Sequence, residues 1–283
     1  MQNEQYELHA EIEEHHWWFL GRRRIMRSVL AEACPPSKQT RVLDVGCGTG
    51  GNIAVLADDY SCVGIDHSAR AIELARERFP QVRFVHGQVP DDVHDELHAA
   101  DVVLLMDVLE HVADDTGFLG RIVDALAPGA HLLITVPADP RLWSPHDVAF
   151  GHYRRYDRSD LAAVWADLPI ATRLVSYYNS RLLPVIRTVR SVNQRRNRAS
   201  GAAGTDFNLP AKPINRMLER FFAGESRVLR RALDNERYAG YRRGASLIAL
   251  VERQAVALPM HRLPMRRTLP AAVAADGRTK RAA

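Results

Sequence analysis

The sequence has 283 residues, 46% of them hydrophobic and 25% charged, with a formal net charge of +4; this ordinary globular composition suffices for one large α/β domain. Its three cysteines (Cys34, Cys47 and Cys62) are odd in number and lack CxxC spacing, which disfavours a disulfide framework and favours a cytoplasmic protein. Neither a secretory signal nor an apolar run near the roughly 18 residues that span a bilayer is found, so we expect no membrane-spanning helix.

Helical spacing before Arg41 ends at Cys34-Pro35-Pro36, which predicts an N-terminal helical lid over residues 1–40. Apolar runs then alternate with helical segments, the rhythm of a parallel sheet whose strands are covered on both faces. These runs are VLDV, CVGI, VRFV, DVVLLM and HLLITV. Residues 41–179 are therefore expected to form the ligand-binding core.

After the fifth run, Pro137 to Tyr156 is predicted to be a long loop, and Arg158 to Asp167 a helix that Asp157 opens. A strand, ATRLVSYY, follows it. The whole pattern predicts an α/β fold with a Rossmann-like, seven-stranded, mostly parallel sheet, helices on both faces, the N-terminal lid and a helical insertion before the last strand.

Residues 180–243 form the predicted insertion. They carry helical spacing near Leu182 to Val189 and from about Ile214 to Leu233, with a Gly/Ala/Ser break at Ser200 to Gly204. The last strand is expected at residues 244–252, which begin GASLIALV. The basic segment 253–283, rich in proline and alanine, is expected to be a disordered tail.

Charge divides the chain near the start of this insertion. Residues 1–179 hold 16 Lys and Arg against 27 Asp and Glu, a net charge of −11, and residues 180–283 hold 22 against 7, a net charge of +15. This basic excess suits an anionic partner such as a phosphate or a lipid headgroup, and a solvated surface explains it as well.

A glycine-rich turn follows the first strand, in the segment Asp44-Val45-Gly46-Cys47-Gly48-Thr49-Gly50-Gly51-Asn52. Glycine suits such a turn because a Cβ would block a ligand from the backbone and because the turn needs unusual backbone angles. The turn alone leaves two cofactors open. Gly46, Gly48 and Gly51 also satisfy the dinucleotide fingerprint GxGxxG, and Asp66 lies the expected distance of about 20 residues farther on.

With Asp44 before it, the turn resembles the first motif of the class I S-adenosylmethionine-dependent methyltransferases. An acid there helps to hold the cationic methionine end of the cofactor, whereas a pyrophosphate would gain nothing from it. The resemblance implies that Asp66 accepts both ribose hydroxyls. The family often has an acid where Gln88 stands, so the adenine would be recognised by the Gln88 amide and the backbone at Val89.

The segments Met106 to Val112 and Leu126 to Gly129 look like later landmarks of the same family. The resemblance makes S-adenosyl-L-methionine the expected cofactor and residues 41–179 its binding core. The cofactor-binding residues it implies are Asp44, Gly46, Cys47, Gly48, Gly50, Asn52, Asp66, His67, Gln88, Val89 and Asp107.

Three further segments resemble a bacterial methyltransferase subfamily whose substrates are mostly unassigned: His15 to Arg23, Gly151 to Tyr156, and Thr205 to Pro210 with Asn215. Trp17 and Trp18 have two readings of equal weight. They could close over the cofactor and line the acceptor site, or they could anchor an N-terminal helix on the sheet.

Methyl transfer to a hydroxyl requires that a proton leave, and histidine is the natural base near neutral pH. His111 follows the fourth strand and His152 lies in the loop after the fifth, so both are candidate catalytic residues. Tyr153, Arg154, Arg155 and Tyr156 could bind a phosphate or carboxylate of the acceptor, and pairing with Asp147 or Asp157 explains these arginines almost as well. The histidines form neither HExxH nor a Cys/His set, so no metal site is predicted.

We therefore expect a methyltransferase that acts on a small-molecule or lipid-linked acceptor, with O-methylation favoured. The arginine-rich insertion could touch an anionic membrane surface, although a helical cap over the site is favoured. The alternatives are an RNA methyltransferase, disfavoured because no RNA-binding module is recognised, and a non-catalytic module that binds the cofactor.

Overall fold

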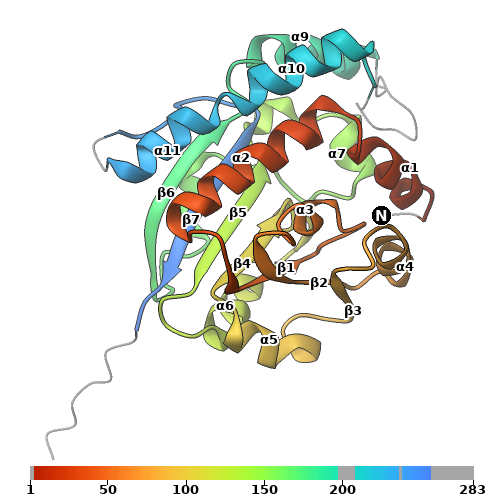
Figure 1. Cartoon of the computed structure of the whole chain (residues 1–283). Helices are drawn as coiled ribbons and strands as arrows, with labels where there is room; N and C mark the ends of the chain where they lie inside the picture. Colours follow the sequence, from red (N-terminus) through yellow and green to blue (C-terminus); the bar gives the residue numbers. More distant parts are fainter. Residues whose placement is uncertain (1–2, 197–207, 236–237, 256–283) are drawn as a thin grey trace, which may run out of the picture.

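The computed structural model describes residues 3–196, 208–235 and 238–255, and these residues build a seven-stranded sheet in the order β3-β2-β1-β4-β5-β7-β6 (Figure 1). Strands β1 to β5 pair in parallel, and β7 runs antiparallel to β5 and β6. The strands are β1 (Ser37–Val45), β2 (Tyr60–Asp66), β3 (Arg83–His86), β4 (Val102–Met106), β5 (His131–Pro137), β6 (Ile170–Tyr178) and β7 (Ser246–Arg253). The predicted fold class is confirmed.

Helices cover both faces of this sheet. They are α1 (Asn3–Glu13), α2 (Trp17–Ala33), α3 (Gly51–Ala54), α4 (Ala69–Arg78), α5 (His94–Ala99), α6 (Asp115–Ala125), α7 (Pro145–Ala149), α8 (Arg158–Ala163), α9 (Leu183–Arg196), α10 (Lys212–Ala223) and α11 (Ser226–Asp234). Short 3-10 helices are η1 (Asp91–Val93), η2 (Leu109–His111) and η3 (Pro140–Leu142). In the described residues no helix is both long and apolar enough to cross a bilayer.

On each face of the sheet, a hydrophobic core fills the space between the strands and the helices. On one face Leu97, Leu119 and Leu161 bring α5, α6 and α8 against the strands. On the other face Ile25 of α2 and Phe222 of α10 are fully buried. Burial of each such side chain contributes roughly 1.5–3 kcal/mol, so the hydrophobic effect holds both helical layers on the sheet.

The N-terminal helices and the insertion, which the sequence predicts as two separate units, pack as one helical layer. Trp17 at the start of α2 donates its backbone N–H to Oδ1 of Asn215 at 2.9 Å, and the Asn215 amide donates to the His15 carbonyl at 2.7 Å. His16 Nε2 lies 3.1 Å from the Asn208 carbonyl. Two of the subfamily-like segments thus contact each other, although Thr205 to Phe207 lie outside the described residues.

The segment from Pro137 to Tyr156 is not a continuous loop, so that prediction was wrong. It contains η3 and α7. Ser144 and Asp147 form a reciprocal capping box at the start of α7, with a proline in its first turn. A five-residue helix offers too few apolar repeats for a periodic pattern to reveal it.

The single helix predicted from about Ile214 to Leu233 is two helices. Arg181 donates to the carbonyls of Phe221 and Gly224 at 3.0 and 3.2 Å, which satisfies the end of α10. The buried Glu225 carboxylate accepts the N–H groups of Ser180 and Arg181 at 2.9 and 2.8 Å. These contacts come from a segment some 40 residues away, so the break lies outside what local spacing can predict.

Other boundaries shift by a few residues. The first strand begins at Ser37 rather than near Arg41, with an irregular register between the two, and the last strand extends to Arg253. The helix that Asp157 caps ends at Ala163 rather than Asp167. The predicted break at Ser200 to Gly204 and the tail from residue 256 onward lie outside the described residues.

Candidate active site

A cavity of about 430 Å³ opens where the parallel strands end, beside the neighbouring strands β1 and β4. The order of strands reverses between these two, which is where open α/β sheets bind ligands. The glycine turn, α1, α2, the loop after β4, the loop after α7, and α9 all contribute to its wall. The cavity is large enough for a cofactor and part of an acceptor.

The glycine turn has the shape of a cradle. Gly46, Gly48 and Gly50 have φ values of 71°, 54° and 85°, the left-handed region that favours glycine. A Cβ on Gly46 would lie 2.8 Å from Val108, and one on Gly50 would lie 2.7 Å from Phe84. A Cβ on Gly48 would meet no atom within 4 Å, so Gly48 leaves room for a ligand to approach the backbone.

Asp44 lies fully buried beneath this turn. Neither of its carboxylate oxygens has a hydrogen-bond partner among the described residues. Burial raises the pKa of Asp44 to about 8, although the Arg22 guanidinium opposes the shift. A buried carboxyl without a partner fits a cationic group that binds nearby, such as the methionine end of S-adenosylmethionine.

Asp66, at the end of β2, is also buried. Its Oδ2 accepts the Gly48 N–H at 2.9 Å and its Oδ1 accepts the Ser68 N–H at 2.8 Å. Each oxygen keeps a second lone pair, so the carboxylate can still accept hydroxyls. His67 points into solvent with 70% of its side chain exposed, and Gln88 is exposed with its backbone N–H bound to Asp92. Val89 is half-buried against the core. Six of the predicted cofactor-binding residues are therefore outside the cavity lining: Asp44, Gly50, Asp66, His67, Gln88 and Val89.

Cys47, Asn52 and Asp107 do line it. Asp107 has a φ of 61°, accepts the Thr135 hydroxyl at 2.9 Å and forms an ion pair with Arg22. Arg22 also lies 4.5 Å from the Trp18 ring and donates to Oδ1 of Asn52 at 3.3 Å. The guanidinium therefore joins the helical lid to the ends of the strands.

The lid itself supplies residues that the sequence analysis missed: Tyr6, His9, Glu13 and Arg22 line the cavity. Glu13 is buried, accepts the Thr49 hydroxyl at 2.7 Å and pairs with Arg78, which fixes α1 over the glycine turn. Trp17 and Trp18 line the cavity and also pack against the second core, so their positions are compatible with both interpretations, and a role in binding the acceptor stays a prediction. No signal in the sequence indicated Glu13, because α1 contains several glutamates and nothing in their spacing distinguishes this one.

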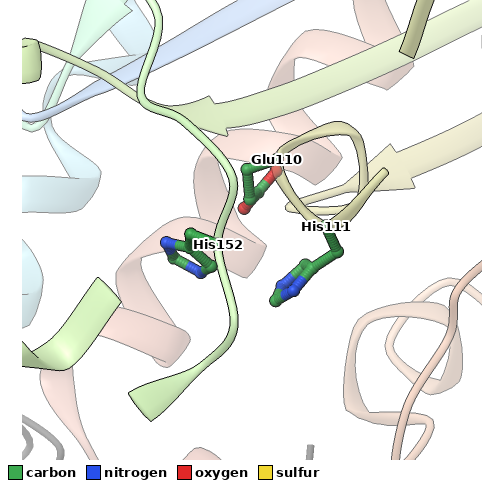
Figure 2. A group of neighbouring side chains, drawn as sticks. All are labelled: Glu110, His111 and His152. Atoms are coloured by element: carbon green, nitrogen blue, oxygen red, sulfur yellow. The ribbon is translucent and has the colours of Figure 1, made fainter. Parts of the chain in front are cut away.

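His111 and His152 meet in the wall of the cavity, with their ring centroids 4.7 Å apart. Glu110 joins them: one ligand atom from each of the three side chains lies within 4.8 Å of the other two (Figure 2). Burial and the nearby Asp107 raise the pKa of Glu110 well above its ordinary value, and burial together with His152 lowers the pKa of His111 to about 4. Glu110 was not among the predicted site residues.

Asp147 holds His152 in place. Its Oδ1 lies 3.0 Å from His152 Nδ1 and 2.8 Å from Arg155 Nε, and its Oδ2 lies 3.2 Å from Arg190. Burial alone would raise the pKa of Asp147, but His152 and the two guanidinium groups lower it overall. Pairing with Asp147, one of the two explanations that the sequence left open, accounts for Arg155.

Apart from His152 and Arg155, the segment from Gly151 to Tyr156 does not line the cavity. Tyr153 is exposed, Arg154 pairs with Asp115 at 2.7 Å, and the buried Tyr156 donates to Asp115 at 2.7 Å. Burial and this hydrogen bond raise the pKa of the Tyr156 phenol. Of the predicted acceptor-binding residues in this segment, Arg155 alone lines the cavity.

Comparison with known proteins agrees with this geometry. A family model described as a methyltransferase domain matches residues 18–183. Two trans-aconitate 2-methyltransferases are similar: that of Variovorax paradoxus is 34% identical over 41% of this chain and 45% of its own length, and that of Paracidovorax citrulli is 31% identical over 59% and 65%. The chain thus spans about half to two thirds of the length of these relatives.

Among solved structures, the complex of the Haloferax volcanii Trm112 methyltransferase activator with its partner shares the fold, with a TM-score of 0.54 and 17% identity over 90% of this chain and 96% of that one. The family match covers more than half of the chain, from the second helix of the lid through α9's first residue. The chain belongs to the methyltransferase domain family and is a class I, S-adenosylmethionine-dependent member of it.

Proposed function

We propose that this protein transfers the methyl group of S-adenosylmethionine to an oxygen of a small-molecule or lipid-linked acceptor. The strongest support is a single cavity that joins the glycine turn and Asp107 to the His111 and His152 rings. When bound, the cofactor supplies an electrophilic methyl carbon on a sulfonium. Donor and acceptor would then lie in one enclosed space, which is the main requirement of an in-line displacement.

The cofactor end of the proposal rests on Asp44, Asp66 and Gly48. Asp66 would accept the ribose hydroxyls while it stays bound to the turn, and Gly48 would allow the ligand to reach the backbone. Asp107 lines the cavity, where it would face the cationic end of the ligand, and Arg22 is placed to bind the ligand's carboxylate. Asp44 lies buried beneath the turn and outside the cavity lining, and a cation bound nearby would favour its charged form.

The acceptor end contains the two histidines. A hydroxyl held between them would lose its proton to an imidazole as its oxygen bonds to the methyl carbon and the carbon–sulfur bond breaks. His152 is the ring that an acid orients, because Asp147 Oδ1 lies 3.0 Å from its Nδ1.

An apolar wall favours a lipid-linked or otherwise hydrophobic acceptor. Val185, Ile186 and Val189 of α9 line the cavity, and Val185 is 61% exposed, so an apolar chain could leave the cavity along this helix. The relatives' names include a polycarboxylate, trans-aconitate, which is a second candidate acceptor. Contact of the arginine-rich helices with a membrane and a cytoplasmic location stay predictions.

Transfer of label from tritiated S-adenosylmethionine will test the proposal. We expect label in the lipid or small-molecule fraction of an extract of the cells that make the protein, and trans-aconitate is assayed beside it as a defined acceptor. Alkaline hydrolysis of the product distinguishes a methyl ester, which is cleaved, from a methyl ether, which is stable. Label confined to RNA would favour an RNA methyltransferase, and the absence of label from every fraction would favour a non-catalytic module.

The ribose role of Asp66 gives a second prediction. Asp66→Ala is expected to weaken binding of S-adenosylhomocysteine by about 1–3 kcal/mol, because charge-assisted hydrogen bonds to the hydroxyls are lost. Calorimetric titration measures the change, with the exposed Asp58→Ala as the matched control. An affinity unchanged by Asp66→Ala would remove this residue from the ribose site.

A further inference from the structure

We propose that Glu110, His111 and His152 form a binding site for one divalent transition-metal ion in the wall of the cavity. Glu110 and His111 belong to η2, which follows β4, and His152 belongs to the segment after α7; the carboxylate and the two imidazoles face a common space (Figure 2). Imidazole ligands favour ions such as Zn²⁺, Ni²⁺ or Fe²⁺, whereas Mg²⁺ prefers oxygen ligands and water.

The state of Glu110 is the first support for the site. The side chain is 0% exposed, yet neither carboxylate oxygen has a hydrogen-bond partner among the described residues. A buried carboxylate without a partner is costly unless it is paired or bound to a metal ion. An ion between Glu110 and the two rings would satisfy it.

The orientation of His152 is the second support. Metal-bound histidines usually donate their other ring N–H to a carboxylate, which fixes the ring and its tautomer. Asp147 lies 3.0 Å from His152 Nδ1 and is itself held by Arg155 and Arg190. Donation from Nδ1 to Asp147 leaves the lone pair on Nε2 available to a metal ion.

The backbone holds the two loops together. Tyr153 donates its N–H to the Glu110 carbonyl at 2.8 Å, and His152 donates its N–H to the Asp147 carbonyl at 3.0 Å. The ligand atoms lie within 4.8 Å of one another, whereas metal–ligand bonds of about 2.0–2.2 Å place them about 3–3.5 Å apart. Small rotations of the side chains would close this difference without moving the loops.

Three protein ligands leave coordination positions open, as in catalytic rather than structural metal sites. These positions face the cavity, so an acceptor oxygen could bind there; this second part rests on the proposed function. In the metal-bound protein a coordinated hydroxyl would become more acidic and would release its proton to solvent, because both imidazoles hold the ion. Proton transfer to an imidazole, as described above, would then belong to the protein without metal.

Metal binding can be measured without cofactor or acceptor. The full chain, free of any histidine tag and stripped with a chelator, is titrated with Co²⁺ by visible absorption and with Zn²⁺ by calorimetry, with Mg²⁺ for comparison. We expect one Co²⁺ or Zn²⁺ per chain and much weaker binding of Mg²⁺. Glu110→Gln and His111→Gln are expected to lower the affinity for Zn²⁺ by about 10- to 100-fold or more.

His98→Gln removes an exposed histidine outside the site and should leave the affinity unchanged. Melting temperatures show that each variant is folded, and Glu110→Gln keeps the size of the side chain while it removes the carboxyl that would bind the ion. Lack of stoichiometric binding at micromolar Co²⁺ and Zn²⁺, or an affinity that Glu110→Gln does not change, would overturn the metal site. If the proposed methyl transfer failed, the outcome of this titration would still be valid, because the titration measures metal binding alone.

Discussion

Asp44→Asn is expected to weaken binding of S-adenosylmethionine by about 10- to 150-fold, or about 1.5–3 kcal/mol, while it leaves the fold intact. The substitution keeps the shape of a fully buried side chain and removes a carboxyl that a bound cationic ligand would hold in its charged form. Calorimetric titration measures the affinity. The exposed Asp58→Asn serves as the control, and an affinity within twofold of the wild type would contradict this role for Asp44.

The same variant should change how stability depends on pH in the absence of ligand. Burial raises the pKa of Asp44 to about 8 in the folded protein, whereas it is about 4 in the unfolded chain. Between these values the folded state keeps a proton that the unfolded state has lost, so the carboxyl lowers the free energy of unfolding as pH rises.

Asp44→Asn has no such proton, so it should equal the wild type below about pH 4 and exceed it by roughly 5 kcal/mol near pH 8. Urea denaturation of the two proteins across this range measures the difference. Parallel stability profiles would show that Asp44 is not the buried acid described above. A gain in stability together with a loss of affinity would show that the carboxyl is retained for binding.

The second large effect concerns Phe222 of α10. Phe222→Ala is expected to lower the free energy of unfolding by about 3–5 kcal/mol, because a fully buried ring leaves a cavity between helix layers. The ring stacks on Tyr178 at 5.9 Å, meets the Trp17 ring edge-on at 5.8 Å and lies over Gly21, where a Cβ would come within 2.6 Å of it.

Phe221→Ala is the matched control. This neighbouring ring is 48% exposed, and its main contact is the Arg181 guanidinium at 5.4 Å, so its loss should cost no more than about 1 kcal/mol. Urea denaturation of both variants gives the comparison. Equal losses would mean that α10 is an appendage rather than part of the core that supports α2 and the cavity.

The strands and the glycine turn could be predicted from the sequence because their signals are local. Continuous apolar runs mark strands buried on both faces, and the turn after Asp44 needs glycine for backbone reasons that hold in any context. The capping role of Asp157 is equally local and is confirmed by its bond to the Asp160 N–H at 2.9 Å.

The layer that closes the cavity could not be predicted in this way. Arg22 and Asp107 are 85 residues apart, and Trp17 and Asn215 are 198 apart, so no periodicity connects them. The local sequence pattern of the insertion predicts an independent pair of helices. Only the packing of its side chains shows that the insertion supports α2, the helix that carries Arg22.

The amino-acid sequence by itself determined the sheet, the glycine cradle and the two acids beneath it, since each follows from spacing and side-chain type along a short stretch of chain. Tertiary structure alone decided that Glu110 and His111 face His152, and that Asp147 turns the Arg155 guanidinium inward while Arg154 and Tyr156 bind Asp115. The physical reason is that ligand sets and ion pairs depend on distances in space, which the folding of two loops onto one sheet edge creates and which no local pattern records.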